Sequence, residues 1–345
     1  MKRPPTMSWL ALIALAVLPP TVASRQDPAY HVVARIPLVG EGGWDYLTVD
    51  TAAHRLYVSR STHVAVIDLD HDSVVGDIPN TPGVHGIAFV RELGRGFTSN
   101  GRDSTVTVFD LATLAALSTI KVTGRNPDAI IYDPLSRRVF TFNGGSANAT
   151  AIDARTGNVV GTIALGGKPE FAASDGRGRM YVNIEDKGEI VAFDTHRLAV
   201  RARWSITPCE EPTGLALDRR GRRLFSVCSN AMMVVVDADR GRVVTTLPIG
   251  SGVDGAVFDP TTRLAFSSNG EGTLTVVHED APDRFRVVAT VPTQRGGRTV
   301  ALDERTHRLY TVAAEYGPTP EPTSDRPRPR PPIIPGSVVV LVLER

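Results

Sequence analysis

The chain has 345 residues, of which 42% are hydrophobic and 22% are charged, a composition typical of folded globular proteins. Its 38 lysines and arginines nearly balance its 37 aspartates and glutamates. This balance argues against a protein that binds nucleic acid through a basic surface, so no nucleic-acid partner is expected. The two cysteines, Cys209 and Cys228, are too few for a structural zinc site of their own.

The first 24 residues have the features of a secretory signal peptide. Lys2 and Arg3 precede an apolar run, and the small residues Ala23 and Ser24 follow it. The run is shorter than the roughly 20 residues that a membrane-spanning helix needs. We therefore predict cleavage near Ser24, a mature chain of residues 25–345 in the periplasm or secreted, and no further membrane contact. A retained N-terminal anchor is the alternative.

One sequence pattern then recurs along the chain at intervals of roughly 40 to 44 residues. It is an apolar run that usually ends in Asp, followed by an aromatic residue that opens a second run, as in "DAIIYDPLSRRVFTFN". The seven copies begin at Asp45, His85, Asp128, Glu170, Thr213, Asp254 and Arg298. The regular spacing indicates one structural unit repeated seven times.

Each unit contains four short strands. After most copies comes a third run that ends in Asp, such as "VAVID" or "VTVFD", and a fourth run follows a turn. An aspartate at the end of a strand favours an Asx turn, which explains Asp68, Asp110, Asp153, Asp194 and Asp237. Four strands per unit are typical of a β-propeller blade. We predict an all-β, seven-bladed β-propeller of four-stranded antiparallel blades, with a β-sandwich as the alternative.

The ends of the chain fit a closed ring. The last copy has strands near Val300, Leu309 and "SVVVLVLE", and the chain then stops. The missing fourth strand matches "HVVARIPL" from His31, which has the same pattern as "SVVGDIPN" of the first unit. We therefore expect the N-terminal strand to complete the last blade of a single propeller domain that spans residues 25–345.

These units resemble the YVTN β-propeller repeats of the YncE-like family. The resemblance rests on "RLYVS", "VFTFN" and "RMYVN" in the second strands and on "AVID", "TVFD" and "VAFD" in the third. It extends over essentially the whole mature chain. It implies a propeller, WD40-like in its blade construction, and an exported protein, but it implies no particular activity, because such propellers serve many functions.

The positions that begin the innermost strands gather around the mouth of a propeller's central channel. We call these seven positions the ring: Asp45, His85, Asp128, Glu170, Thr213, Asp254 and Arg298. Unpaired like charges at such partly desolvated positions are costly. A bound cation, a cationic or polyhydroxylated ligand, or raised carboxylate pKa values would balance them. The alternative is simple ion pairing with loop arginines such as Arg60 and Arg102.

The ring leads to a first functional hypothesis. The candidate ligand-binding residues are Asp45, His85, Asp128, Glu170, Glu211, Asp254 and Arg298, with Trp44, Tyr46 and Phe171 as aromatic walls. They predict a monomeric binding protein for a small polar molecule, a cation or a periplasmic protein partner. His85 is also an acid–base candidate, because a carboxylate neighbour raises a histidine pKa. No motif of a known catalytic class assigns catalytic residues.

Asparagines suggest a second hypothesis. Asn100, Asn143, Asn183, Asn230 and Asn269 stand near the ends of second strands. Asn is common at turns for local reasons, but carboxylate and amide oxygens together also suit Ca²⁺. The candidate metal ligands are Glu170, Asp254, Asn143 and Asn183. By architectural analogy such an ion would serve a metal-assisted hydrolase or lactonase. A pure interaction scaffold is the third hypothesis, and no cofactor other than a divalent cation is expected.

Two further features fall on the same face. Cys209 and Cys228, 19 positions apart, are predicted to form a disulfide in one blade, with a copper-binding or redox pair as the alternative. The segment Gly317–Gly336 is rich in Pro and Arg and interrupts the last blade. It predicts either a disordered surface loop or an electrostatic lid over the acidic face. We expect its "PPIIPG" end to be ordered against the body.

Overall fold

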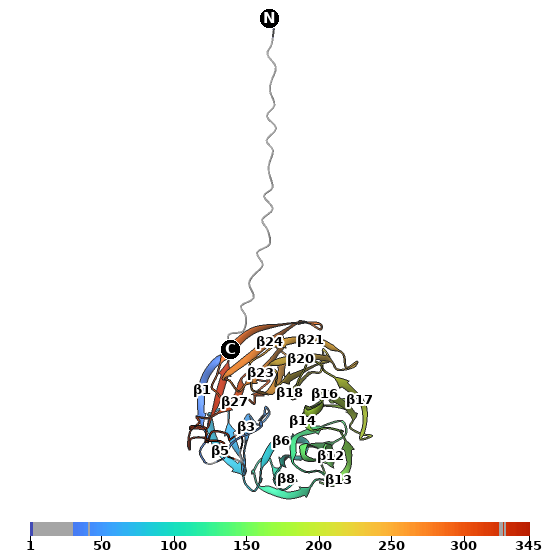
Figure 1. Cartoon of the computed structure of the whole chain (residues 1–345), viewed down its shortest axis with the longest axis vertical. Helices are drawn as coiled ribbons and strands as arrows, with labels where there is room; N and C mark the ends of the chain where they lie inside the picture. The colour runs from blue at the N-terminus through green and yellow to red at the C-terminus, as the bar shows by residue number, and fades with distance from the viewer. Residues whose placement is uncertain (3–29, 41, 324–326, 328) are drawn as a thin grey trace.

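The computed structural model describes residues 1, 2, 30–40, 42–323, 327 and 329–345. The predicted signal peptide and its cleavage site therefore lie outside the described residues, apart from the first two positions. The described strands form seven separate four-stranded sheets, arranged around a common axis (Figure 1). This is the predicted seven-bladed β-propeller.

The first six blades each follow the chain from the axis outward. Blade one contains β2 (Leu47–Asp50), β3 (Arg55–Arg60), β4 (His63–Asp68) and β5 (Ser73–Ile78). Blade two contains β6 (Val84–Val90), β7 (Arg95–Asn100), β8 (Thr105–Asp110) and β9 (Ala116–Lys121). Blade three contains β10 (Pro127–Asp133), β11 (Arg138–Asn143), β12 (Asn148–Asp153) and β13 (Val159–Ala164).

The next three blades repeat the arrangement. Blade four contains β14 (Pro169–Ser174), β15 (Arg179–Ile184), β16 (Glu189–Asp194) and β17 (Ala199–Ser205). Blade five contains β18 (Pro212–Asp218), β19 (Arg223–Cys228), β20 (Met232–Asp237) and β21 (Val243–Pro248). Blade six contains β22 (Val253–Asp259), β23 (Leu264–Asn269), β24 (Thr273–Ala281) and β25 (Arg284–Pro292).

Blade seven is built from both ends of the chain. It contains β26 (Ala301–Leu302), β27 (Leu309–Ala313), β28 (Val339–Glu344) and β1 (His31–Pro37). β1 pairs antiparallel with β28, from His31 opposite Glu344 to Pro37 opposite Val339. Figure 1 shows the blue β1 at the red, C-terminal end of the chain. The predicted closure by the N-terminal strand is confirmed.

Burial explains why one blade needs its neighbours. In β11 every residue after Arg138 is buried, so this strand is covered on both faces. In the outermost β17 the residues alternate between exposed and half-buried. Aromatic side chains fill the spaces between blades, as in the pairs Phe140–Phe193 and Phe225–Phe258 with ring centroids 5.5 and 5.1 Å apart. Stacking of the blades therefore supplies the hydrophobic core.

On the face opposite the ring, the repeated aspartates at the ends of the first strands form ion pairs between neighbouring blades. Arg91 Nη2 of blade two lies 2.9 Å from an Asp50 carboxylate oxygen of blade one. His307 Nδ1 of blade seven lies 2.8 Å from Asp259 Oδ2 of blade six. His54 Nε2 of blade one lies 3.2 Å from a carboxylate oxygen of Asp303 of blade seven. These recurring residues connect neighbouring blades.

The aspartates that close the third strands form the expected turns. Asp110 Oδ1 accepts hydrogen bonds from the backbone N–H groups of Ala112 and Thr113, at 3.0 and 2.8 Å. Backbone N–H groups two or three residues downstream also donate to Asp68, Asp153, Asp194 and Asp237. The Asx-turn prediction is confirmed, and it leaves these carboxylates with a local structural role.

In the part of the chain that the structure describes, three short 3₁₀ helices occupy inter-strand loops: η1 (Arg91–Leu93), η2 (Gly144–Ser146) and η3 (Glu185–Lys187). η2 and η3 connect the second and third strands of their blades, and therefore lie on the ring face. Within the described part of the chain, no helix has the length and apolar character needed to span a bilayer.

The closing strand offers a direct test of the core. Ile36 in β1 is only 3% exposed and belongs to the cluster between blades one and seven, whereas Val33 in the same strand is 40% exposed. We expect Ile36→Ala to lower the free energy of unfolding by about 2–4 kcal/mol, because it removes buried methyl groups and leaves a cavity. Val33→Ala, the matched control, should cost well under about 1 kcal/mol. Urea denaturation measures both values, and equal effects would contradict closure by a packed β1.

Candidate functional site: an ionisable ring at the channel mouth

The structure brings the first, second, third, sixth and seventh ring positions into one set of charge contacts. His85 Nδ1 lies 2.5 Å from Asp45 Oδ2 and 3.7 Å from Asp128 Oδ1. Arg298 Nε lies 2.8 Å from Asp254 Oδ2, and its Nη2 lies 3.8 Å from Asp45 Oδ1. Residues up to 253 positions apart in the sequence therefore meet around the axis, as the repeat predicts.

Glu170 of blade four adds a carboxyl group with few partners. Its Oε2 is buried and has no hydrogen-bond partner among the described residues. Lys168 Nζ lies 3.5 Å from this oxygen, an ion-pair distance, but the same ammonium is in close contact with Glu185. The site therefore includes a buried acidic oxygen that has a shared ion-pair contact but no well-formed hydrogen bond among the described residues.

Lys168 and Glu185 were not among the sequence candidates. Lys168 stands just before β14, two residues ahead of Glu170, and Glu185 begins η3 on the ring face. Glu185 also acts on the ring electrostatically, because it contributes to raising the pKa values of Glu170 and Asp254. The sequence could have indicated both residues: Lys168 lies two positions before the ring residue Glu170, and Glu185 lies in a loop between a second and a third strand, on the ring face.

Second-strand polar side chains hold the ring backbone of the following blade. Ser99 Oγ donates to the Asp128 carbonyl, and Ser268 Oγ donates to the Arg298 carbonyl. Asn183 Nδ2 donates to the Thr213 carbonyl at 2.7 Å. These contacts fix the first-strand starts, so the ring side chains project from a well-positioned backbone.

Charge crowding changes the proton affinity of the ring groups. Burial lowers the pKa of His85, but the hydrogen bond to Asp45 and the nearby Asp128 and Glu170 outweigh it and raise the pKa to about 9. Burial raises the pKa of Asp128, and the His85 imidazolium only partly opposes this effect. His85 is therefore cationic at neutral pH and stabilises the two aspartates beside it.

Burial also raises the pKa values of the ring carboxyl groups of blades four and six, Glu170 and Asp254. Burial raises the pKa of Asp254 to about 6, against the opposing charge of Arg298. Burial and the neighbouring Asp128 hold the pKa of Glu170 far above the range of an ordinary carboxyl. This shift favours the protonated form of Glu170, although the Lys168 ammonium opposes it. Raised pKa values are one of the three ways of balancing the ring charge that the sequence left open.

Tyr46 and Phe171 lie at the ring end of the central channel. Their ring centroids are 5.1 Å apart. Burial, together with Asp128 and Glu170, keeps the pKa of Tyr46 far above its usual value. A hydrogen bond from Tyr46 to Asp128 favours the charged carboxylate. Both rings line a channel cavity of about 350 Å³, whose walls combine aliphatic side chains with the charged residues Arg219 and Glu304.

The asparagine side chains are used within and between blades. Asn143 Oδ1 accepts from Thr141 Oγ1 at 3.0 Å, and its Nδ2 donates to Asn148 and Thr150. Asn100 and Asn269 repeat this arrangement in blades two and six. The amide oxygen of Asn183 accepts from Ser226 Oγ at 3.1 Å.

The proposed metal set of Glu170, Asp254, Asn143 and Asn183 stays a prediction, and the amide oxygens of Asn143 and Asn183 already accept hydrogen bonds from Thr141 and Ser226. Among the described His, Cys, Asp and Glu residues, Asp45, His85 and Asp128 form a group with ligand atoms within 4.8 Å of one another. Arg60, one of the two loop arginines offered as counter-ions, donates hydrogen bonds to the carbonyls of Gly40 and Gly42.

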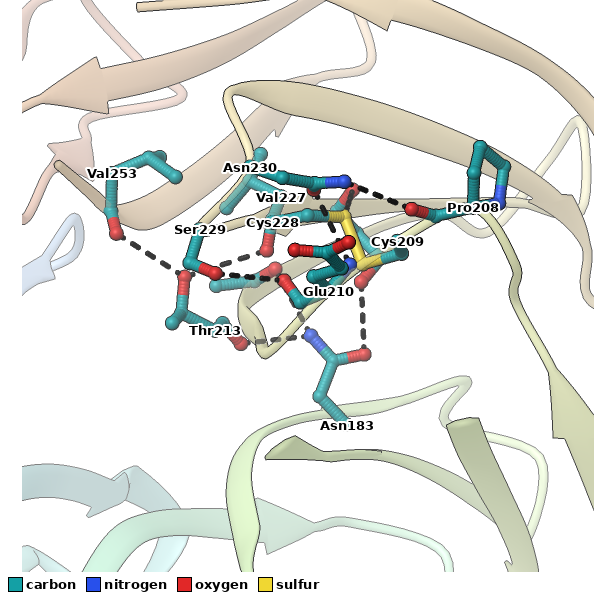
Figure 2. Close-up of a disulfide and its surroundings, with 12 residues drawn as sticks. Asn183, Pro208, Cys209, Glu210, Thr213, Val227, Cys228, Ser229, Asn230 and Val253 are labelled. Carbon is teal, nitrogen blue, oxygen red and sulfur yellow. Dashed lines mark hydrogen bonds between the residues drawn. A yellow bond between two sulfur atoms is a disulfide. The ribbon is translucent and has the colours of Figure 1, made fainter. Parts of the chain in front are cut away.

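The predicted disulfide joins Cys209 to Cys228 (Figure 2). Around it, Asn230 Nδ2 donates to the Pro208 carbonyl at 2.9 Å, and the Ser229 N–H donates to the Glu210 carbonyl at 2.9 Å. This network fixes the loop that leads into β18 and Thr213. Glu211 is exposed and lines a surface pocket together with Glu185, rather than making the ring contacts described above.

Trp44 also lies beside the ring rather than over it. It is half-buried, packs against the cluster between blades one and seven, and lines a second cavity with Arg298 and Ile333. Of the ten sequence candidates for ligand binding, Glu211 and Trp44 are thus displaced towards neighbouring pockets.

Comparisons with solved structures find the same fold at low sequence identity. A chain of "Kuenenia stuttgartiensis Hydrazine Synthase" is 16% identical with a TM-score of 0.70, over 79% of this chain and 94% of that chain. A chain of "Crystal Structure of Mitotic Checkpoint Complex" is 14% identical with a TM-score of 0.74, over 98% and 99%. No family model and no curated protein sequence matches the chain. The likeness establishes the propeller fold alone.

The shifted histidine gives a prediction for pH. His85 has a pKa of about 9 when folded and an ordinary value of 6.5. The stability it contributes is therefore fully present below pH 6.5 and is lost as the pH rises to about 9. We expect His85→Gln to remove on the order of 1–3 kcal/mol at pH 6 and much less above pH 9.

Urea denaturation of wild type and variant between pH 6 and pH 9.5 measures this difference. His196→Gln is the matched control, because the His196 side chain is exposed in the turn after β16. If the free energies of unfolding of wild type and His85→Gln changed with pH in the same way, the ring carboxylates would not raise the pKa of His85.

Proposed function

We propose that this protein is a binding protein whose ring face holds a small polar ligand with a cationic or hydrogen-bond-donating group. A β-propeller is a fold that commonly serves as a platform for binding. The observation that carries the proposal is the buried Glu170 Oε2, which has no hydrogen-bond partner among the described residues. A buried polar atom left unsatisfied is costly, and a donor group on a ligand would remove that cost.

The surrounding charges support a donor or cation. Asp45, Asp128 and Asp254 face His85 and Arg298, so carboxylates outnumber the cations in direct contact with them. Tyr46 and Phe171 supply two aromatic rings, inclined at 55° to each other, beside the carboxylates. A cation also interacts favourably with aromatic faces. This combination suits an amine, a quaternary ammonium or a polyhydroxylated compound.

Ligand binding at this ring is linked to protons. Burial and Asp128 raise the pKa of Glu170, which favours a proton on this carboxyl in the free protein. An arriving cation favours the ionised carboxylate, so binding releases a proton and becomes tighter as the pH rises. This linkage separates binding at the ring from binding to an ordinary exposed carboxylate.

A divalent cation is the second candidate ligand. Two carboxylates and one imidazole, from Asp45, Asp128 and His85, offer ligand atoms within 4.8 Å of one another. Oxygen and nitrogen ligands of this kind suit Zn²⁺ or another first-row metal better than an all-oxygen Ca²⁺ site. A metal at these residues is the basis on which the alternative of a metal-assisted hydrolase would rest.

The proposal also covers the compartment of the protein and the repeat family that it resembles. The Cys209–Cys228 disulfide fits an oxidising compartment such as the periplasm or the cell exterior. The signal-peptide pattern of the first 24 residues and the likeness of the strands to YVTN repeats point the same way. We propose an exported, monomeric protein of the YncE-like type. A pure interaction scaffold, whose protein partners bind away from the ring, is the competing hypothesis.

A thermal-shift panel tests the binding proposal. The probes are Ca²⁺, Zn²⁺, putrescine, choline and sorbitol, each at pH 6 and pH 8. We expect at least one probe to raise the Tm of the wild type, and to do so more at pH 8 because a proton is released. The double variant Asp128→Asn/Glu170→Gln should lose this increase.

Asp77→Asn/Glu189→Gln is the matched control, because it removes the same two residue types from outer positions of blades one and four. It should retain the full Tm increase. A wild type unaffected by every probe, or an increase that survives in Asp128→Asn/Glu170→Gln, would remove the ring as the binding site. An increase confined to Zn²⁺ and Ca²⁺ would select the metal hypothesis.

A further inference from the structure

A second cavity of about 360 Å³ opens beside the ring, with a different character. Its walls include Trp44, Tyr316 and Ile333 together with three arginines, Arg295, Arg298 and Arg330. Its volume lies at the small end of the range for small-molecule sites. The cavity thus combines flat apolar surfaces with clustered positive charge.

The Pro-rich segment builds one wall of this cavity. Tyr316 and Ile333 form an isolated antiparallel bridge, the Gly317 N–H donates to the Pro332 carbonyl at 2.8 Å, and the Ile334 N–H donates to the Glu315 carbonyl at 2.9 Å. Ile333 also packs on the core between blades one and seven. The "PPIIPG" end is therefore ordered against the body, and it places Arg330 at the cavity.

Glycine allows the opposite wall to come close. Gly296 has a φ of +91°, and a Cβ at this position would lie 2.6 Å from the Tyr316 hydroxyl oxygen. Only glycine combines this backbone conformation with so close a neighbour. The Tyr316 ring therefore lies directly against the 295–298 turn that carries two of the arginines.

The three arginines converge on Tyr316. Burial raises the pKa of this tyrosine, while Arg298, Arg295 and Arg330 all oppose the increase through their charges. Arg298 is engaged with Asp254 and Asp45 of the ring. Within the described residues, no carboxylate lies within ion-pair distance of Arg295 or Arg330. Both guanidinium groups belong to exposed residues at the cavity, and neither has a carboxylate counter-ion among the described residues.

Trp44 provides a further unused donor. Its Nε1 is buried and has no hydrogen-bond partner among the described residues. Indole N–H groups and guanidinium groups both donate, and neither accepts. A ligand group that accepts hydrogen bonds and carries negative charge would therefore match the guanidinium donors that line the cavity.

We propose that this cavity, which we call the arginine pocket, binds a small aromatic anion through its carboxylate or phosphate group. The guanidinium groups of Arg295 and Arg330 pair with the anionic group, in the forked geometry that arginine offers to carboxylates and phosphates. The aromatic body lies against Trp44 and Tyr316. The site is separate from the proposed donor-binding ring, with which it shares Arg298.

Isothermal titration calorimetry of the full chain tests this proposal. The probes are phenyl phosphate and benzoate, with inorganic phosphate for the charge alone and benzyl alcohol for the aromatic body alone. We expect saturable binding of phenyl phosphate or benzoate, weaker binding of inorganic phosphate and no measurable binding of benzyl alcohol. Arg295→Ala/Arg330→Ala should weaken phenyl phosphate or benzoate binding by about tenfold or more.

The control Arg242→Ala/Arg284→Ala removes two exposed arginines from outer positions of blades five and six, and should leave binding within about twofold of wild type. Trp44→Ala should weaken phenyl phosphate more than inorganic phosphate. Circular dichroism verifies that each variant is folded. Absence of saturable binding to wild type, or equal affinity in a folded Arg295→Ala/Arg330→Ala variant, would overturn the proposal.

The ring and the arginine pocket can fail separately. Asp128→Asn/Glu170→Gln should bind phenyl phosphate or benzoate as wild type does, because both substituted residues lie outside the lining of the arginine pocket. Loss of anion binding in that variant would place the anion at the ring instead and overturn the assignment.

Discussion

The antiparallel pairing of β1 with β28 is the contact on which the rest of the structure depends. It joins the two ends of the chain in one blade and so closes seven sheets around an axis. Only a closed ring buries both faces of every blade, as the fully covered second and third strands require. Closure also creates the axis itself, and with it a place where equivalent positions of different blades become neighbours.

That geometry has an electrostatic consequence. The starts of the innermost strands carry ionisable side chains in six of seven blades, and closure packs most of them within reach of one another. The protein balances this crowding partly with internal cations, His85 and Arg298, and partly with protons on carboxyl groups such as Glu170. Neither the cations nor the protons give the buried Glu170 Oε2 a hydrogen-bond partner among the described residues. This missing hydrogen bond is the physical basis for proposing a ligand at the ring.

The sequence predicted the fold and the convergence of the ring because both follow from periodicity. Once equivalent positions are known to share an axis, Asp45 must lie near Asp128 even though they belong to different units. It did not predict contacts made by residues outside the repeat, such as Lys168 with Glu185, or the alternative use of Asn143 and Asn183 inside and between blades. Side-chain direction decides those contacts, and a repeat pattern does not encode it. The Cys209–Cys228 disulfide could be predicted from the sequence because the chain has only two cysteines.

The protonation state of Glu170 tests the central claim, that closure crowds these carboxyl groups on one axis. Infrared spectroscopy at pH 7 distinguishes a protonated carboxyl from a carboxylate, and Glu170→Gln identifies the contribution of this residue. The raised pKa predicts a protonated-carboxyl band in the wild type that is absent from the variant. Identical spectra in this region would mean that Glu170 is ionised in an ordinary environment, and the account of a crowded ring would be wrong.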